Sequence, residues 1–340
     1  MKIFKYLLFL LLIVIIGFCI YTAVQPNSFK VSKTRTINAP ASVIYNNVID
    51  FKNWKTWSSW AEDDSNMKVY LSEQTKGING SFSWENGNGV GFMKTIQAIP
   101  YTTIEQDMEV ADFPTASIHW HFDQKKNGST QLTYDISGDN LSFGFKVFSI
   151  LTGGIEKRIN SHYQLNLEKL DSAVVANMAK YSITVNGITE HSGGFYIFNS
   201  TSSKITDVNH KVFELLPKLE SYIDKYSISM AGSPFVKYHY LDEENNAAMF
   251  SCCIPTTSRV ITTENDILTG QLEPFRALKT TLLGNYTNLQ EAWKNTMTYV
   301  TEHDLVIDET GPKLETFVTD SLDSPNPADW KTEIYIALKE

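Results

Sequence analysis

The sequence of 340 residues contains only three cysteines, Cys19, Cys252 and Cys253. Cys19 lies in an apolar run and the other two are neighbours, so a disulfide framework is excluded. Positive charge is also scarce, because 29 lysines and arginines are outnumbered by 38 aspartates and glutamates, for a net charge of −9. A general nucleic-acid-binding protein needs a basic surface, so we expect no nucleic-acid partner.

Motifs of several enzyme classes are missing as well. The sequence has no Gly-x-Ser-x-Gly elbow, phosphate-binding loop or dinucleotide fingerprint. His119 and His121 could offer two metal ligands from one face of a strand, but no further ligand follows at a suitable spacing. We interpret this pair as a solvated outer face, and we expect neither a metal nor a cofactor.

A long apolar run occurs at the N-terminus, from Tyr6 to Val24 (residues 6–24). At 1.5 Å per residue it spans about 28 Å, close to the roughly 30 Å hydrocarbon core of a bilayer. A cleaved signal peptide is the alternative, but Tyr21 stands where cleavage would need a small residue. We therefore expect an uncleaved, single-pass membrane anchor over residues 1–27.

The orientation of this anchor stays open. Lys2 and Lys5 on one side nearly balance Lys30, Lys33 and Arg35 on the other, and it is the asymmetry of such charges that orients a membrane helix. We favour an arrangement with the following domains outside the cytoplasm.

The region 28–178 alternates like a sheet with a few helices. Turn signals such as Asn79-Gly80 and Asn127-Gly128 separate short runs of β-type residues. The order is one strand, two short helices, six antiparallel strands and one long helix. The strands are expected over residues 29–37, 67–74, 79–86, 89–98, 101–110, 115–124 and 129–137, and the long helix over 154–175.

The alternation also predicts which side chains of this sheet face inward. In TASIHWHF, Ile118 and Trp120 share one face of the strand. By the same reasoning Trp84 faces inward, and so do Val90 and Phe92. A curved sheet lined with large aromatics and wrapped around one helix leaves a tapering space, which becomes either core or a ligand cavity.

The segment INAPASVIYNNVIDFKNWKTWSSW carries a resemblance to the SRPBCC superfamily, the START-like or polyketide-cyclase-like proteins. The shared pattern is a strand, Ala-Pro, a helix, then Asp-Phe, Trp and a Trp-Ser-Pro-Trp-like end, with Ser59 where proline is usual. The resemblance covers about 150 residues and implies a helix-grip fold with a hydrophobic cavity, but no single reaction. The residues expected to line that cavity are Trp57, Trp60, Trp84, Trp120 and Phe92.

The region 179–340 contains an internal repeat. Each half reads as two strands, a helix and a hairpin, and Gly232 and Gly311 occupy equivalent turns. Two such halves side by side predict a pseudo-two-fold sheet with both helices on one face. The expected ranges are strands 181–188 and 193–200 with helix 207–225 in the first half, and strands 258–267 and 271–283 with helix 286–304 in the second.

The last strand, KTEIYIAL, has two distinct faces. Ile334 and Ile336 should pack under the helix, as should Cys252 in the first half. Glu333 and Tyr335 then lie on the opposite face. A carboxylate beside an aromatic ring can hold an organic cation by charge and cation–π attraction. The alternative is an ordinary surface glutamate.

Three segments, SPFVKYHYLDEENNAAMFSCCIP, LEPFRALKTTLLGNYTNLQEAWKNTMTYV and DWKTEIYIAL, resemble the GyrI-like small-molecule-binding domain. This is the effector-binding domain of bacterial AraC-type and MerR-type multidrug regulators. The resemblance implies a central pocket with a carboxylate at the position of Glu333 and aromatic neighbours. Carried over by position, the ligand-site candidates are Glu333, Tyr335, Trp293 and Tyr286. Some similar proteins hydrolyse strained small molecules with a glutamate and a tyrosine.

The sequence thus predicts an α+β chain with a transmembrane helix (1–27), a helix-grip domain (28–178) and a duplicated domain (179–340). The favoured function is a membrane-anchored protein with a START-like cavity and a GyrI-like pocket, which bind small hydrophobic, amphipathic or cationic molecules. One alternative is a hydrolase acting on small electrophiles through Glu333 and a tyrosine. Another is a partner-interaction protein whose pockets are filled core. No catalytic residue is assigned.

Overall fold

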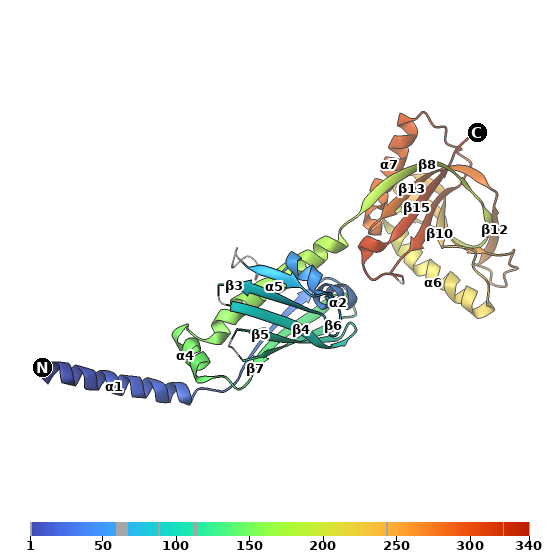
Figure 1. Cartoon of the computed structure of the whole chain (residues 1–340). Coiled ribbons are helices and arrows are strands. Elements are labelled where there is room, and N and C mark those ends of the chain that lie inside the picture. Colours follow the sequence, from blue (N-terminus) through green and yellow to red (C-terminus); the bar gives the residue numbers. More distant parts are fainter. Residues whose placement is uncertain are drawn as a thin grey trace. The chain divides into compact units, whose positions relative to one another are not determined.

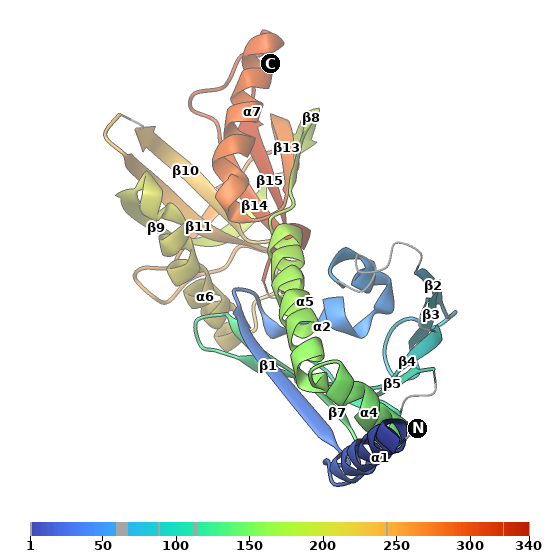
Figure 2. The ribbon, with the colours of Figure 1, turned by 90° about the vertical axis from the view of Figure 1, so that its left-hand side faces the viewer.

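The computed structural model of the chain describes residues 2–58, 67–87, 89–111, 114–242, 244–321 and 323–339. The chain divides into two compact units, Met1–Ala176 and Asn177–Glu340. Figures 1 and 2 show the first unit in blue to green and the second in yellow-green to red. Each unit is built on its own antiparallel sheet, of seven and eight strands respectively, which confirms the predicted α+β class.

The first helix, α1 (Lys2–Ala23), is exposed along nearly all of its length. Its 22 residues span about 33 Å at 1.5 Å per residue. Residues 3–23 are long and apolar enough to cross a membrane. A signal sequence meets the same criterion, so both a membrane anchor and a signal sequence fit this helix.

The sheet of the first unit has the strand order β1-β7-β6-β5-β4-β3-β2. Two short helices, α2 (Ala41–Ile49) and η1 (Phe51–Thr56), connect β1 to β2. The long helix α5 (Ile155–Met178) follows the sheet, preceded by α4 (Phe143–Leu151), a helix that the sequence analysis missed. The strands are β1 (Phe29–Ile37), β2 (Lys68–Leu71), β3 (Ser81–Asn86), β4 (Gly89–Ile99), β5 (Thr103–Val110), β6 (Ala116–Gln124) and β7 (Thr130–Gly138).

The prediction that Val90 and Phe92 face inward is wrong, because they are 61% and 38% exposed. Trp84 on β3 pairs with Gly91 on β4, and cross-strand partners project to the same face. A Cβ on Gly91 would lie 2.1 Å from the Trp84 ring, so the missing side chain gives the indole its place. The inward positions of β4 therefore include Gly91 and the fully buried Met93.

The sheet of the second unit has the strand order β12-β9-β11-β10-β14-β15-β13-β8. Counted inward from the two edges of the sheet, equivalent strands of the two repeats occupy equivalent positions: β12 and β8, β9 and β13, β11 and β15, β10 and β14. The first strand of each repeat, β8 or β12, pairs with a strand of the other repeat. A pseudo-two-fold axis therefore passes between β10 and β14. The strands are β8 (Ser182–His191), β9 (Gly194–Lys204), β10 (Phe235–Asp242), β11 (Ala247–Thr256), β12 (Leu268–Leu272), β13 (Phe275–Leu283), β14 (Lys313–Thr319) and β15 (Lys331–Ala337).

One predicted strand of the repeat is wrong. Residues 258–267 form a loop, and β12 begins only at Leu268. The segment Thr263-Glu264-Asn265-Asp266 is rich in the side chains that favour turns over strands. The Asn199 side chain binds the Asp266 backbone oxygen at 2.7 Å and helps to hold this loop.

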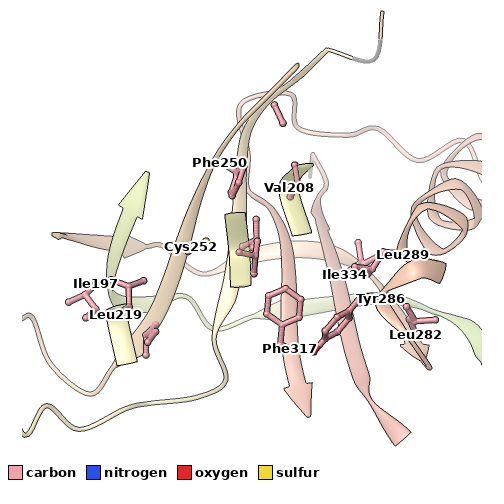
Figure 3. Close-up of a cluster of buried hydrophobic side chains, with 14 of the residues drawn as sticks. Ile197, Val208, Leu219, Phe250, Cys252, Leu282, Tyr286, Leu289, Phe317 and Ile334 are labelled. Atoms are coloured by element: carbon pink, nitrogen blue, oxygen red, sulfur yellow. The ribbon is translucent and has the colours of Figure 1, made fainter. Parts of the chain in front are cut away.

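The main core of the second unit lies between the sheet and two helices, α6 (Val208–Tyr226) and α7 (Leu289–Glu302). Figure 3 shows part of this cluster. Ile334, Ile336 and Cys252 belong to it, as the alternation predicted. A smaller cluster that includes Phe235 and Cys253 covers the opposite face of the sheet.

Candidate functional site

The four residues predicted for the GyrI-like ligand site lie on two faces of one sheet. Trp293 on α7 and Tyr286 in η3 (Tyr286–Asn288) pack in the cluster between the sheet and the helices. Tyr335 packs against the cluster on the opposite face. Glu333, two residues from Tyr335 on β15, shares that opposite face. The sheet therefore separates the four residues into two pairs, which cannot form one pocket.

Glu333 is held by three donors. Its Oε2 atom accepts a hydrogen bond of 2.6 Å from the Tyr335 hydroxyl and lies 2.9 Å from Lys279 Nζ. Its Oε1 atom lies 2.7 Å from Lys331 Nζ. Burial acts to raise the pKa of Glu333, but the donors outweigh burial and lower the pKa to about 2. With two lysines as partners, this carboxylate has little negative charge left to attract a cation.

Glu315 on β14 is a second buried carboxylate, which the sequence analysis missed. It is 3% exposed and pairs across the sheet with Val236 and Ile334, so it faces the helices. Its carboxylate accepts hydrogen bonds from Trp293 Nε1 and from the Tyr238 hydroxyl. Among the described residues, no lysine or arginine forms a salt bridge with it. Burial raises the pKa of Glu315, and the two hydrogen bonds offset only part of this effect.

Aromatic rings surround Glu315 on the helix side. The rings of Tyr238 and Trp293 meet edge to face with centroids 5.9 Å apart, and both residues are half-buried. Phe317 lies two residues from Glu315 on the same face of β14. Its ring packs edge to face against the Tyr286 ring, with ring centroids 5.3 Å apart (Figure 3). Trp293 and Tyr286 thus belong with Glu315 and not with Glu333.

The Tyr286 end of this aromatic group is acidic. The pKa of the Tyr286 hydroxyl is raised mainly by burial and further by the negative charges of Asp320 and Asp323. The pKa of Glu220 on α6 is raised for the same reasons, by burial and then by Asp320 among its neighbours. Negative charge and aromatic surface therefore occur together on the helix side of the sheet.

Three of the aromatic residues predicted for the START-like cavity are buried in the first unit, whereas a fourth, Phe92, is 38% exposed and does not face the interior. Trp57, Trp84 and Trp120 are 5% exposed or less. The Trp57 ring meets that of Trp120, which stacks on Tyr134 at 3.7 Å between centroids, and Tyr134 in turn contacts Tyr163 of α5 at 4.4 Å. These rings fill the space between the sheet and α5, so a ligand there would have to displace them. Trp60 lies outside the described residues.

Two family models match the chain. Residues 37–168 match the model described as polyketide cyclase / dehydrase and lipid transport. Residues 203–339 match the model of the GyrI-like small molecule binding domain. The chain joins a polyketide-cyclase-like domain to a GyrI-like domain. No curated protein matches it.

Several solved structures are distantly similar to the chain. A cryo-EM structure of an EcmrR–DNA complex matches with 16% identity over 54% of this chain and 64% of that chain, with a TM-score of 0.41. The crystal structure of the EcmrR C-terminal domain matches with 15% identity, 47% and 98% coverage, and a TM-score of 0.41. A protein from Chromobacterium violaceum matches with 14% identity, 44% and 98% coverage, and a TM-score of 0.33. The DNA in the first structure is bound by that protein.

Comparing the two halves of the internal repeat in the GyrI-like domain could have identified Glu315 from the sequence. Gly311 follows Gly232 by 79 residues, and Glu315 follows Val236 by the same 79. The sheet pairs Val236 directly with Glu315, so the two lie at the pseudo-two-fold axis. A carboxylate whose counterpart in the repeat is a fully buried valine does not contribute to packing alone, and is a candidate for a functional site.

Proposed function

We propose that the chain is a membrane-anchored small-molecule-binding protein whose GyrI-like domain binds lipophilic organic cations at Glu315. The observation that carries this proposal is the nearly complete burial of the Glu315 carboxylate against Trp293 and Tyr238, with no cationic side chain paired to it among the described residues. The match of residues 203–339 to a small-molecule-binding family supports the same class of function.

The physical reason for a cationic ligand is the cost of burying an unpaired charge. A buried carboxylate either takes up a proton or needs a positive partner. An organic cation would supply that partner, and the faces of Trp293 and Tyr238 would add cation–π attraction. Because burial raises the pKa of Glu315, a bound cation would compete with a proton. Affinity should therefore rise as the pH rises through that pKa.

The test is the affinity of the full chain for tetraphenylphosphonium, measured by isothermal titration calorimetry in detergent micelles. Glu315→Gln should weaken binding by about tenfold or more, since a close, desolvated pair of opposite charges contributes about 1.5 kcal/mol or more to binding. Glu333→Gln is the matched control, because it removes a carboxylate from the opposite face of the same sheet, and it should leave the affinity unchanged. Weaker binding by Glu333→Gln alone would place the site at Glu333. If both variants bind as tightly as the wild type, neither carboxylate holds the cation.

A hydrolase is the second candidate, and the pair Glu315 and Tyr238 favours it. A carboxyl group with a raised pKa beside a tyrosine hydroxyl can exchange protons with a substrate as a general acid or base. Glu333, with its pKa of about 2, is poorly suited to that role. Hydrolysis of a small epoxide that is lost in Glu315→Gln but kept in Glu333→Gln would support this candidate.

The anchoring role of α1 rests on its length and apolar composition. We place the two units outside the cytoplasm, and protease digestion of spheroplasts should then degrade both of them. The mass of the mature protein decides between an anchor and a cleaved signal sequence, because cleavage would shorten the chain at its N-terminus.

A further inference from the structure

A buried lysine ties α4 to the end of α1. Lys146 on α4 is 7% exposed. Its Nζ donates a hydrogen bond of 2.8 Å to the Gln25 backbone oxygen and another to Asn27 Oδ1. Both acceptors lie in the short linker directly after α1, and α4 itself contacts α1. Wherever the end of α1 lies, α4 is held beside it.

A cavity of about 340 Å³ opens at this corner. Lys146 lines it together with Ser28 and Phe29 at the start of β1, and Ile150 and Gly154 near the end of α4. An ammonium group has three donors, and two of those on Lys146 are taken by uncharged oxygens. Among the described residues, no carboxylate forms a salt bridge with it. The corner therefore holds a buried positive charge whose neutralising partner would be an anion.

The outward face of α4 is apolar. Phe143, Phe148 and Leu151 are 49%, 41% and 72% exposed. They lie within about 140° of the helix circumference at 3.6 residues per turn. On the inward face, Phe145 stacks on Phe29 of β1 with ring centroids 6.4 Å apart. The exposed apolar face is thus fixed in place beside the end of α1.

We propose that this corner is a phospholipid site. The apolar face of α4 lies in the bilayer interface among the acyl chains, as an interfacial helix does. The cavity behind it takes the phosphate of a headgroup from the same leaflet, and that phosphate accepts a hydrogen bond from Lys146. The proposal rests on α1 spanning the membrane, and it is independent of cation binding at Glu315.

The depth of α4 can be measured in the full chain. Cys19 is replaced by serine, Cys252 and Cys253 are kept because both are fully buried, and one added cysteine at position 13, 125, 143 or 151 carries an environment-sensitive fluorophore. The chain is reconstituted in nanodiscs with spin-labelled lipids that quench fluorescence. Ile13→Cys reports on α1, and Lys125→Cys in the exposed β6–β7 turn is the control outside the bilayer. We expect quenching at positions 13, 143 and 151, and none at 125.

The outcomes separate this proposal from the anchor itself. Quenching at 13 with none at 143 and 151 would overturn the interfacial position of α4 while leaving the anchor intact. No quenching at 13 would remove the anchor, and this proposal with it, whereas cation binding at Glu315 would still stand.

The headgroup site is tested by titrating the full chain in detergent with dihexanoyl phosphatidylglycerol, and in a second arm with inorganic phosphate. Lys146→Gln should weaken lipid binding by about tenfold or more. Ser28→Trp, which fills the cavity from an exposed position and leaves Lys146 in place, should do the same. The exposed Lys125→Gln should change the affinity by less than about twofold.

Near-ultraviolet circular dichroism checks that each variant keeps its fold. If Lys146→Gln unfolds the corner, Ser28→Trp still decides. Lipid binding that survives Ser28→Trp would overturn the cavity as the headgroup site. Inorganic phosphate that binds as tightly as the lipid would overturn the lipid and leave a plain phosphate site.

Discussion

Replacing Glu333 with glutamine should make the stability of the GyrI-like domain less dependent on pH. The carboxylate binds Lys279, Lys331 and the Tyr335 hydroxyl, and its pKa falls from an ordinary value of 4.5 to about 2. A depressed pKa in the folded state means that the contribution is fully present above pH 4.5. It is lost as the pH falls from 4.5 through 2.

The size of the effect follows from the same pKa. A fall from 4.5 to about 2 corresponds to at most about 3.4 kcal/mol, at 1.36 kcal/mol for each pKa unit. Lys279 and Lys331 are 26% and 37% exposed, so solvent screens part of the attraction. We expect Glu333→Gln to cost about 1–2 kcal/mol at neutral pH, with roughly half of that difference gone by about pH 3.

The measurement is hydrogen exchange by mass spectrometry on peptides that span β15, in the full chain equilibrated with urea. Local peptides are needed because the chain has two compact units, and a single unfolding midpoint would mix them. The difference between the wild type and Glu333→Gln is compared at about pH 7 and pH 3. An equal difference at both pH values would refute the assignment of the stabilisation to the ionised carboxylate.

Three further outcomes are expected. Glu315→Gln should show the opposite trend with pH. Burial raises the pKa of Glu315, so the wild type loses stability as the pH rises above 4.5 towards the folded pKa, and the variant does not. Hydrogen exchange on β14 peptides in which the wild type becomes more protected than the variant as the pH rises would contradict this. Gly91→Ala should destabilise the first unit by about 1–3 kcal/mol, because its Cβ would lie 2.1 Å from the Trp84 ring, whereas Gly87→Ala meets no atom within 4 Å and should melt like the wild type in a thermal scan. Burial raises the pKa of Cys252 to about 12, so this thiol should resist maleimide at about pH 8 until the chain unfolds, and rapid labelling of the folded chain would argue against its burial.

The alternation of side chains predicted much of both sheets because a strand has a period of two. It assigned Ile334 and Ile336 to the core beneath the helices, where they lie. It failed at Phe92 because the buried Trp84 indole on β3 occupies the space where a side chain on Gly91 would lie. Gly91 therefore takes the inward position on β4, and Phe92 beside it points outward. Composition within a strand cannot reveal that kind of constraint, which comes from the strand beside it.

The helix α4 was missed for a related reason. Its buried face contains a lysine and its exposed face contains Phe143, Phe148 and Leu151, which is the reverse of the pattern of a helix on a soluble protein. The linker oxygens that bind Lys146 explain why a lysine is buried there, and only the tertiary structure shows that they lie beside it.

The sequence alone determined the N-terminal apolar helix, the two-part organisation and the internal repeat, because these depend on run lengths and periods along one chain. Only the tertiary structure decided which carboxylate stands apart from positive charge. Glu333 and Glu315 each stand between a threonine and an apolar residue in a strand. The packing of β13 and β15 gives Glu333 two lysines, whereas the packing of α7 and β10 gives Glu315 the Trp293 indole and the Tyr238 hydroxyl. Partners from distant strands and helices set the charge balance of a buried group, and a local pattern does not contain them.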